Sequence, residues 1–195
     1  MAKIKLNPLF GEVRGKLGRI VIKQSKNGQA FIAKLPEKSK DQPSPAQLAH
    51  RLAFAKASDY AKSAAEEETT HAFYEDLARR RKTTLRAVCM GDYMNAPTIA
   101  RLDFSEYKGN VGDCIWIITH DDVGVVDVNV RLTRLDGTPI ESGKAVEEHA
   151  GSGIWKYIAT LPVPLGTAIH ISANAFDRPG HRAIASADPI VGESY

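Results

Sequence analysis

The segment Val125-Val126-Asp127-Val128-Asn129-Val130-Arg131-Leu132 alternates apolar and polar side chains from Val126 onward. Successive side chains of a β-strand point to opposite faces, so this pattern predicts a strand with one buried and one solvated face. An apolar run at 114–118 (CIWII) predicts a strand before it, and the Asp-Gly turn at 135–138 (LDGT) predicts a hairpin after it.

Further strands are predicted at 153–160 and 168–175, with Gly, Pro and Asp turns between them. Short strands at this spacing are typical of a β-sandwich, so we expect residues 99–195 to form one. Trp116 and Trp155 lie within predicted strands, and we interpret both as core residues.

The segment before the sandwich has helical features. Residues 44–47 (SPAQ) are a helix start signal, with Ser as the N-cap, Pro in the first turn and Gln closing a capping box. Apolar residues then recur at helical spacing until the run at 66–70 interrupts them. A second helix is expected from about residue 69 towards Tyr93, so 45–96 is predicted to be a helical hairpin.

Two β-prone runs flank Asn27-Gly28 near the N-terminus. Both of these turn residues tolerate positive φ, so the pattern predicts a β-hairpin of residues 18–25 and 28–35. A polar linker at about 36–44 follows the hairpin.

These elements predict the α+β fold class in two domains. The first domain, residues 1–98, contains the basic β-hairpin and the helical hairpin. The second domain, residues 99–195, is the all-β sandwich.

The segment FGEVRGKLGRI, residues 10–20, has glycines and a lysine like those of a phosphate-binding loop. A Walker loop needs four residues between its glycines, a Ser or Thr after its lysine, and a following helix. Here three residues separate Gly11 from Gly15, Leu17 follows Lys16, and a predicted strand comes next. We interpret the segment as a basic arm whose glycines permit bends.

The cysteines and histidines show no spacing typical of a metal or catalytic site. Cys89 and Cys114 are expected to be buried, reduced thiols. The six histidines form no His-Glu-X-X-His pattern, and the sequence has no Gly-X-Ser-X-Gly elbow. We therefore expect no enzymatic activity, no cofactor and no metal in a catalytic role.

Composition favours a soluble globular protein. Hydrophobic residues make up 43% and charged residues 25% of the 195 residues. No secretory signal and no apolar run of membrane-spanning length is present. We expect cytoplasmic synthesis without a signal peptide and no membrane partner, with an assembled particle or virion as an alternative final location.

The net charge of +3 is unevenly distributed, with +8 over residues 1–60, +1 over 61–101 and −6 over 102–195. A basic N-terminal part and an acidic C-terminal part favour one of two arrangements. Either the N-terminal part binds a polyanionic partner, or it contacts the C-terminal part of another copy. The candidate interaction residues are basic and lie in the arm, the hairpin and the second helix: Arg14, Lys16, Arg19, Lys23, Arg79, Arg80 and Arg81.

Acidic residues occur in two turns that we expect at the same end of the sandwich. Asp121 and Asp122 precede the strand at 125–132, and Asp177 follows the strand at 168–175. The three are candidates for a Ca²⁺ site, because this hard cation takes several oxygen ligands. The favoured alternative is that each aspartate caps its own turn, since no Asp-X-Asp-X-Asp-Gly loop is present.

Three segments, at 117–128 (IITHDDVGVVDV), 153–157 (GIWKY) and 173–181 (ANAFDRPGH), follow one another in the C-terminal half. Together they resemble bacterial immunoglobulin-like domains over residues 100–185. The resemblance implies an immunoglobulin-like β-sandwich that serves as an adhesive or spacer module. The Cys–Trp–Cys core of antibody domains is absent.

The N-terminal part has Asn-Pro-Leu at 7–9, three spaced glycines, the hairpin, and then PAQLAHR at 45–51. This order resembles a family of small bacterial and phage proteins of unknown function, over residues 7–60. The resemblance implies a structural or particle-assembly role and brings no catalytic residues.

We expect a non-enzymatic structural protein that forms a homo-oligomer or filament through its basic N-terminal arm and its acidic immunoglobulin-like domain. A phage-derived particle is the most concrete version, with other particle proteins as further partners. The alternative is a nucleic-acid-binding protein that uses the basic N-terminal region. A module that binds a small molecule or a sugar is the third hypothesis.

Overall fold

The computed structural model of the protein describes residues 2–4, 15–24, 30–35 and 42–192. The chain divides into two compact units, Met1–Pro45 and Ala46–Tyr195. The helices thus belong to the same unit as the C-terminal strands, whereas the sequence places a boundary near residue 98.

The described part of the N-terminal unit is a sheet of four short strands: β1 (Ala2–Ile4), β2 (Gly15–Leu17), β3 (Ile20–Gln24) and β4 (Ala30–Lys34). The sheet is antiparallel in the order β1-β4-β3-β2. The predicted hairpin is confirmed, since β3 pairs with β4 and Ile22 lies opposite Ile32. Its Asn27-Gly28 turn lies outside the described residues. Sequence analysis did not predict β1 and β2, which extend the hairpin on either side.

Residues 15–20 of the segment at 10–20 are described, and residues 10–14 lie outside the described part. Gly15, Lys16 and Leu17 form strand β2. A two-residue turn, Gly18-Arg19, joins β2 to β3, and Gly18 has a φ of +58°, which glycine adopts without strain. A strand therefore follows Lys16 where a phosphate-binding loop requires a helix.

The second unit begins with three helices: α1 (Pro45–Glu66), α2 (Glu68–Arg80) and α3 (Leu85–Met94). α1 begins at the predicted Pro45, but the prediction of one helix from about residue 69 towards Tyr93 is wrong. α2 ends at Arg80, and Lys82 adopts a positive φ of 52°. The Thr84 hydroxyl then caps α3 by accepting a hydrogen bond from the Ala87 N–H at 3.2 Å, which starts a new helix.

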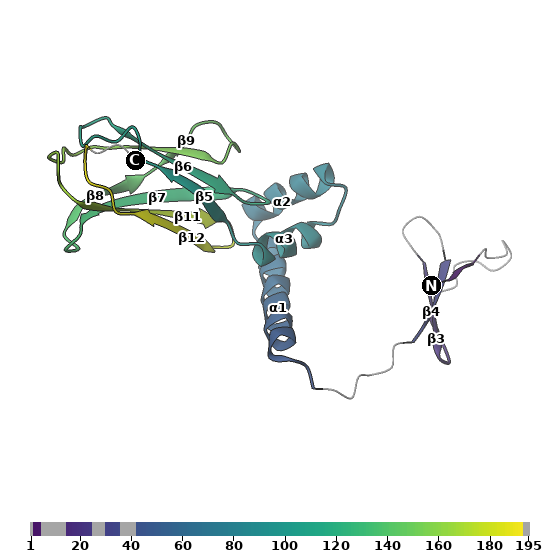
Figure 1. Ribbon diagram of the computed structural model, residues 1–195. Helices are drawn as coiled ribbons and strands as arrows, with labels where there is room; N and C mark the ends of the chain where they lie inside the picture. The colour runs from purple at the N-terminus through teal and green to yellow at the C-terminus, as the bar shows by residue number, and fades with distance from the viewer. Residues whose placement is uncertain (1, 5–14, 25–29, 36–41, 193–195) are drawn as a thin grey trace. The chain divides into compact units, whose positions relative to one another are not determined.

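In the rest of the described chain, strands form two antiparallel sheets, in the orders β5-β6-β10-β9 and β12-β11-β7-β8 (Figure 1). Their bounds are β5 (Thr98–Asp103), β6 (Cys114–His120), β7 (Val125–Arg134), β8 (Pro139–Lys144), β9 (Val146–Glu147), β10 (Ile154–Ile158), β11 (Ile169–Asp177) and β12 (Arg182–Ala187). The predicted strands correspond to β6, β7, β10 and β11, and the predicted turn at 135–138 joins β7 to β8. The other four were not predicted.

The two sheets enclose one hydrophobic core. Both contribute buried residues to it: Ile115, Ile117, Trp155 and Tyr157 from one sheet, and Val128, Val130, Leu132, Ile169, Ile171, Ala173 and Ala175 from the other. The prediction that Trp155 lies in the core is confirmed, and the prediction for Trp116 is wrong. Trp116 alternates with two buried isoleucines and therefore faces outward, where its Nε1 donates to Glu106 Oε2 at 3.0 Å.

Helices α2 and α3 lie at one end of these sheets (Figure 1). Buried helix residues form a second hydrophobic cluster, and Val123 from the turn between β6 and β7 packs against it. The rings of Tyr93 and His181 lie 4.8 Å apart, and the Arg178 guanidinium lies 4.0 Å from the centroid of the Phe73 ring. Turns of the sandwich and side chains of the helices thus share one interface.

Candidate functional site

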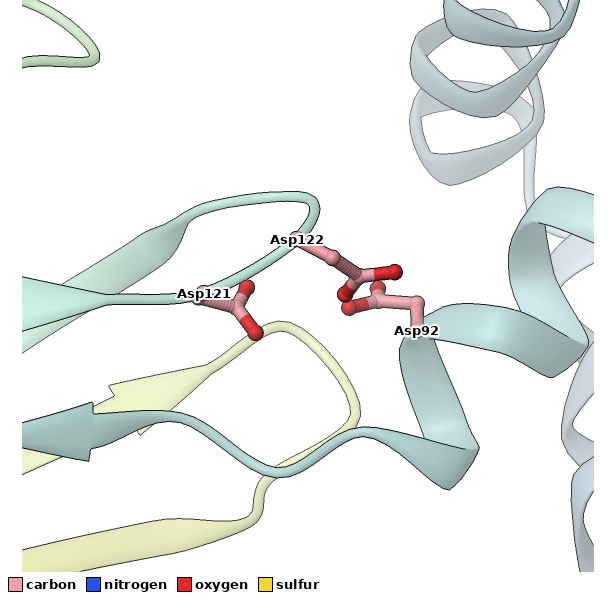
Figure 2. Close-up of side chains that lie close together, drawn as sticks. All are labelled: Asp92, Asp121 and Asp122. Carbon is pink, nitrogen blue, oxygen red and sulfur yellow. The ribbon is translucent and has the colours of Figure 1, made fainter.

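Three aspartates meet at this interface (Figure 2). Asp92 comes from α3, and Asp121 and Asp122 come from the turn between β6 and β7. One carboxylate oxygen of each lies within 4.8 Å of the corresponding oxygens of the other two. Like charges at such separations repel unless a proton or a cation lies with them.

The packing of α3 places Asp92 in this position. Val88 and Asp92 are four residues apart, so they share the buried face of the helix, and Asp92 is 0% exposed. The Tyr74 hydroxyl donates a hydrogen bond to Asp92 Oδ2, and the Tyr60 hydroxyl lies 2.7 Å from that of Tyr74. Asp92 Oδ1 is buried and has no hydrogen-bond partner among the described residues.

The two carboxylate oxygens of Asp121 differ in their contacts. Its Oδ2 accepts hydrogen bonds from the backbone N–H groups of Val123 at 3.3 Å and Gly124 at 2.6 Å, which closes the turn. Its Oδ1 is buried and accepts no hydrogen bond from any described residue. The turn-capping alternative therefore describes one oxygen of this carboxylate and leaves the other available.

Asp122 is the exposed member of the group. The Asn95 side-chain amide donates to Asp122 Oδ2 at 3.4 Å, and the Arg81 guanidinium donates to the backbone carbonyl of Asp122. Both contacts hold the turn against the helices. Asp122 is thus the member of the group that solvent reaches, whereas Asp92 is fully buried.

The pKa of the Asp92 carboxyl is raised to about 7, mainly by burial and also by the negative charges of Asp121, Asp177 and Asp122, while the hydrogen bond from Tyr74 acts in the opposite direction. Within the described part of the chain, no Lys, Arg or His side chain forms an ion pair with Asp92, Asp121 or Asp122. The site therefore concentrates negative charge without a matching cation.

Asp177, which the sequence groups with Asp121 and Asp122, has other partners. One of its oxygens accepts from the His181 backbone N–H at 2.6 Å, and the other lies 2.8 Å from His181 Nδ1. Its charge still acts on Asp92, but both its oxygens are engaged in its own turn. Asp92, which sequence analysis did not single out, is the third member of the group instead.

The basic candidate interaction residues lie in both units. Arg14 lies outside the described residues, and Lys16, Arg19 and Lys23 are exposed on the N-terminal sheet. The arginine run at 79–81 lies at the end of α2. Arg80 pairs there with Asp76, and Arg81 contacts the turn of the acidic site, so part of this run is engaged within its own unit.

Both cysteines are free thiols. Cys89 is buried, as predicted, and desolvation with the nearby Asp92 charge raises its pKa to about 11. Cys114 is half-buried on β6, which differs from the buried position expected for it.

No protein-family model matches the sequence, and no curated protein matches it significantly. Among the described helices, none combines the length and the apolar character needed to cross a membrane.

Proposed function

We propose that this protein is a non-enzymatic structural protein that associates with copies of itself through its N-terminal unit. The observation that carries the proposal is that none of the N-terminal side chains whose exposure is described, at 15–23 and 31–35, is buried. Leu17 is 68% exposed, and Ile22, Phe31 and Ile32 are only half-buried. Short strands need a further packing surface to bury such residues, and a second copy supplies one.

The edges of the N-terminal sheet support the same proposal. β1 and β2 are its outer strands, and among the described residues each pairs with a strand on one side only. The free backbone N–H and C=O groups of an edge strand accept a strand from another chain. Contacts of this kind build a ring when the rotation between copies closes and a filament when it does not.

Opposite charges favour contact between the N-terminal sheet of one copy and residues 102–195 of another. Lys16, Arg19 and Lys23 are exposed on the N-terminal sheet, and residues 102–195 carry a net charge of −6. Such attraction accelerates association and weakens as salt screens it.

The first half of α1 offers a further apolar surface. Leu48, Leu52 and Phe54 are 52%, 60% and 53% exposed. Leu48 and Leu52 are four residues apart and therefore lie on one face of the helix. Burial of this face against another copy would add apolar contact area to an assembly.

The strand order supports an immunoglobulin-like class for the sandwich. With β5 to β12 designated A, B, C, C′, D, E, F and G, the sheets become A-B-E-D and G-F-C-C′. Immunoglobulin-like sandwiches combine strands in this way. A domain of this class acts as a spacer or adhesive module, which fits a structural role.

Light scattering of the full chain tests the proposal. We expect assemblies larger than a dimer at micromolar concentration in low salt, and smaller species in about 1 M NaCl, where screening acts beyond about 3 Å. The triple variant Lys16→Glu, Arg19→Glu, Lys23→Glu should remain monomeric in low salt. The variant Lys108→Glu, Arg131→Glu, Arg134→Glu makes the same change of charge within the acidic residues 102–195 and should still assemble in low salt.

A monomer whose mass is independent of salt would contradict self-association. The alternative is nucleic-acid binding. It would be favoured if the wild type shifts single-stranded or duplex DNA on a gel and the N-terminal triple variant does not.

A further inference from the structure

We propose that Asp92, Asp121 and Asp122 form a Ca²⁺ site that joins α3 to the turn between β6 and β7. The three carboxylates come from two parts of one unit and converge on a common space (Figure 2). One oxygen of each lies within 4.8 Å of the others. Because Ca–O distances are about 2.3–2.6 Å, a single ion can contact oxygens up to about 5 Å apart.

Two unpartnered oxygens point independently to a ligand. Asp92 Oδ1 and Asp121 Oδ1 are both buried without a hydrogen-bond partner among the described residues. In each carboxylate the second oxygen is already held, by the Tyr74 hydroxyl in Asp92 and by turn N–H groups in Asp121. A buried polar atom without a partner is costly, and a bound cation would satisfy both oxygens together.

The charge of the group also favours a divalent cation. The side chains that act electrostatically on Asp92 include three further carboxylates, those of Asp121, Asp177 and Asp122. The Arg81 guanidinium contacts this turn at the backbone carbonyl of Asp122 and not at a carboxylate. A bound Ca²⁺ would offset the negative charge that no described side chain neutralises.

The donor set selects the type of ion. All the candidate ligand atoms are carboxylate oxygens, which suit hard cations, whereas zinc and copper sites favour His and Cys. Ca²⁺ accepts six to eight oxygens in flexible geometry, but Mg²⁺ demands a near-ideal octahedron at about 2.0–2.1 Å. Exposed Asp122 leaves room for water molecules to complete the larger and more flexible Ca²⁺ shell.

The proposed site would act within one chain and does not rest on self-association. Its ligands belong to the helical cluster and to the sandwich, so bound Ca²⁺ would tie these two parts together. An ion that binds only the folded arrangement stabilises it by mass action.

Calorimetric titration of the chelator-treated full chain with CaCl₂ at pH 7.5, followed by thermal unfolding, tests the site. We expect one ion per chain and, at 100-fold excess over Kd, a rise in Tm of roughly 5–10 °C. Asp122→Asn, at an exposed position, and Asp92→Asn, which still accepts from Tyr74, should each weaken binding at least tenfold. The control Asp59→Asn, at an exposed residue of α1 that pairs with Lys62, should leave binding unchanged.

Circular dichroism would establish that each variant is folded before its titration is interpreted. Absence of binding heat and of any Tm change up to about 5 mM CaCl₂, above the weakest class of protein calcium sites, would overturn the proposal. Binding that persists unchanged in both site variants would place the ion elsewhere and overturn it as well. Tighter binding of Mg²⁺ than of Ca²⁺ would overturn the assignment of the ion.

Discussion

Without bound metal, raising the pH from 4 to 8 should change the stability of Asp92→Asn relative to wild type by about 3–4 kcal/mol in favour of the variant, measured as the free energy of unfolding. The reason is that burial and three neighbouring carboxylates raise the pKa of Asp92 from an ordinary 3.8 to about 7 in the folded protein. Between these two values the folded state keeps a proton that the unfolded state has lost. The free energy of unfolding of the wild type therefore falls as the pH rises through this window, and the fall ends above about pH 7.

Urea unfolding at a series of pH values between 4 and 8, in the presence of a chelator, measures this difference. The asparagine side chain that replaces Asp92 in the variant carries no charge but still offers an oxygen to Tyr74, so the hydrogen bond that orients the side chain is kept. Asp59→Asn should give a curve parallel to that of the wild type, since Asp59 pairs only across an exposed helix turn. Parallel curves for wild type and Asp92→Asn would show that Asp92 does not titrate in this range.

Gly109→Ala should lower the free energy of unfolding by about 3–5 kcal/mol, the largest effect of a single methyl group that we expect in this chain. Gly109 has a φ of +87°, which disfavours any other residue. A Cβ there would also lie 2.3 Å from the Val163 carbonyl oxygen and 2.6 Å from Val191 Cγ1. The backbone carbonyl cannot move aside without disturbing the Val163 N–H to Gly109 hydrogen bond of 2.8 Å.

Gly112→Ala is the matched control. Gly112 has a similar φ of +93°, but no heavy atom lies within 4 Å of the Cβ that alanine would add. The free energy of unfolding of this variant should fall only by the cost of placing alanine at a positive φ, about 1–2 kcal/mol. Equilibrium unfolding of both variants separates backbone strain from steric overlap, and equal losses would show that the close approach at Gly109 relaxes without cost.

Features encoded by adjacent residues could be predicted from the sequence. Asn27-Gly28 indicates the hairpin of β3 and β4, and Pro45 marks the start of α1. The face of Trp116 could not be predicted in the same way, because five consecutive apolar residues at 114–118 fit either register of the strand. Burial of Ile115 and Ile117 in the shared core turns Trp116 outward.

The candidate site shows a similar limit. Asp121 and Asp122 are visible as an acidic turn, but Asp92 lies on a helix well before them, and only tertiary packing brings it close. A signal for it does exist in the sequence. Asp92 lies four residues after Val88 in the segment VCMGDYM at 88–94, where it is the only charged residue on an otherwise apolar helix face.

The burial of Cys89 gives the protein an internal chemical reporter. The thiolate is the form that reacts with alkylating reagents, so a buried thiol with a pKa of about 11 stays inert while the helices remain packed. Its rate of alkylation at fixed pH therefore measures local opening of the helical cluster, separately from the half-buried Cys114. Mass spectrometry of the unmodified sequence can follow both reactions without any engineered label.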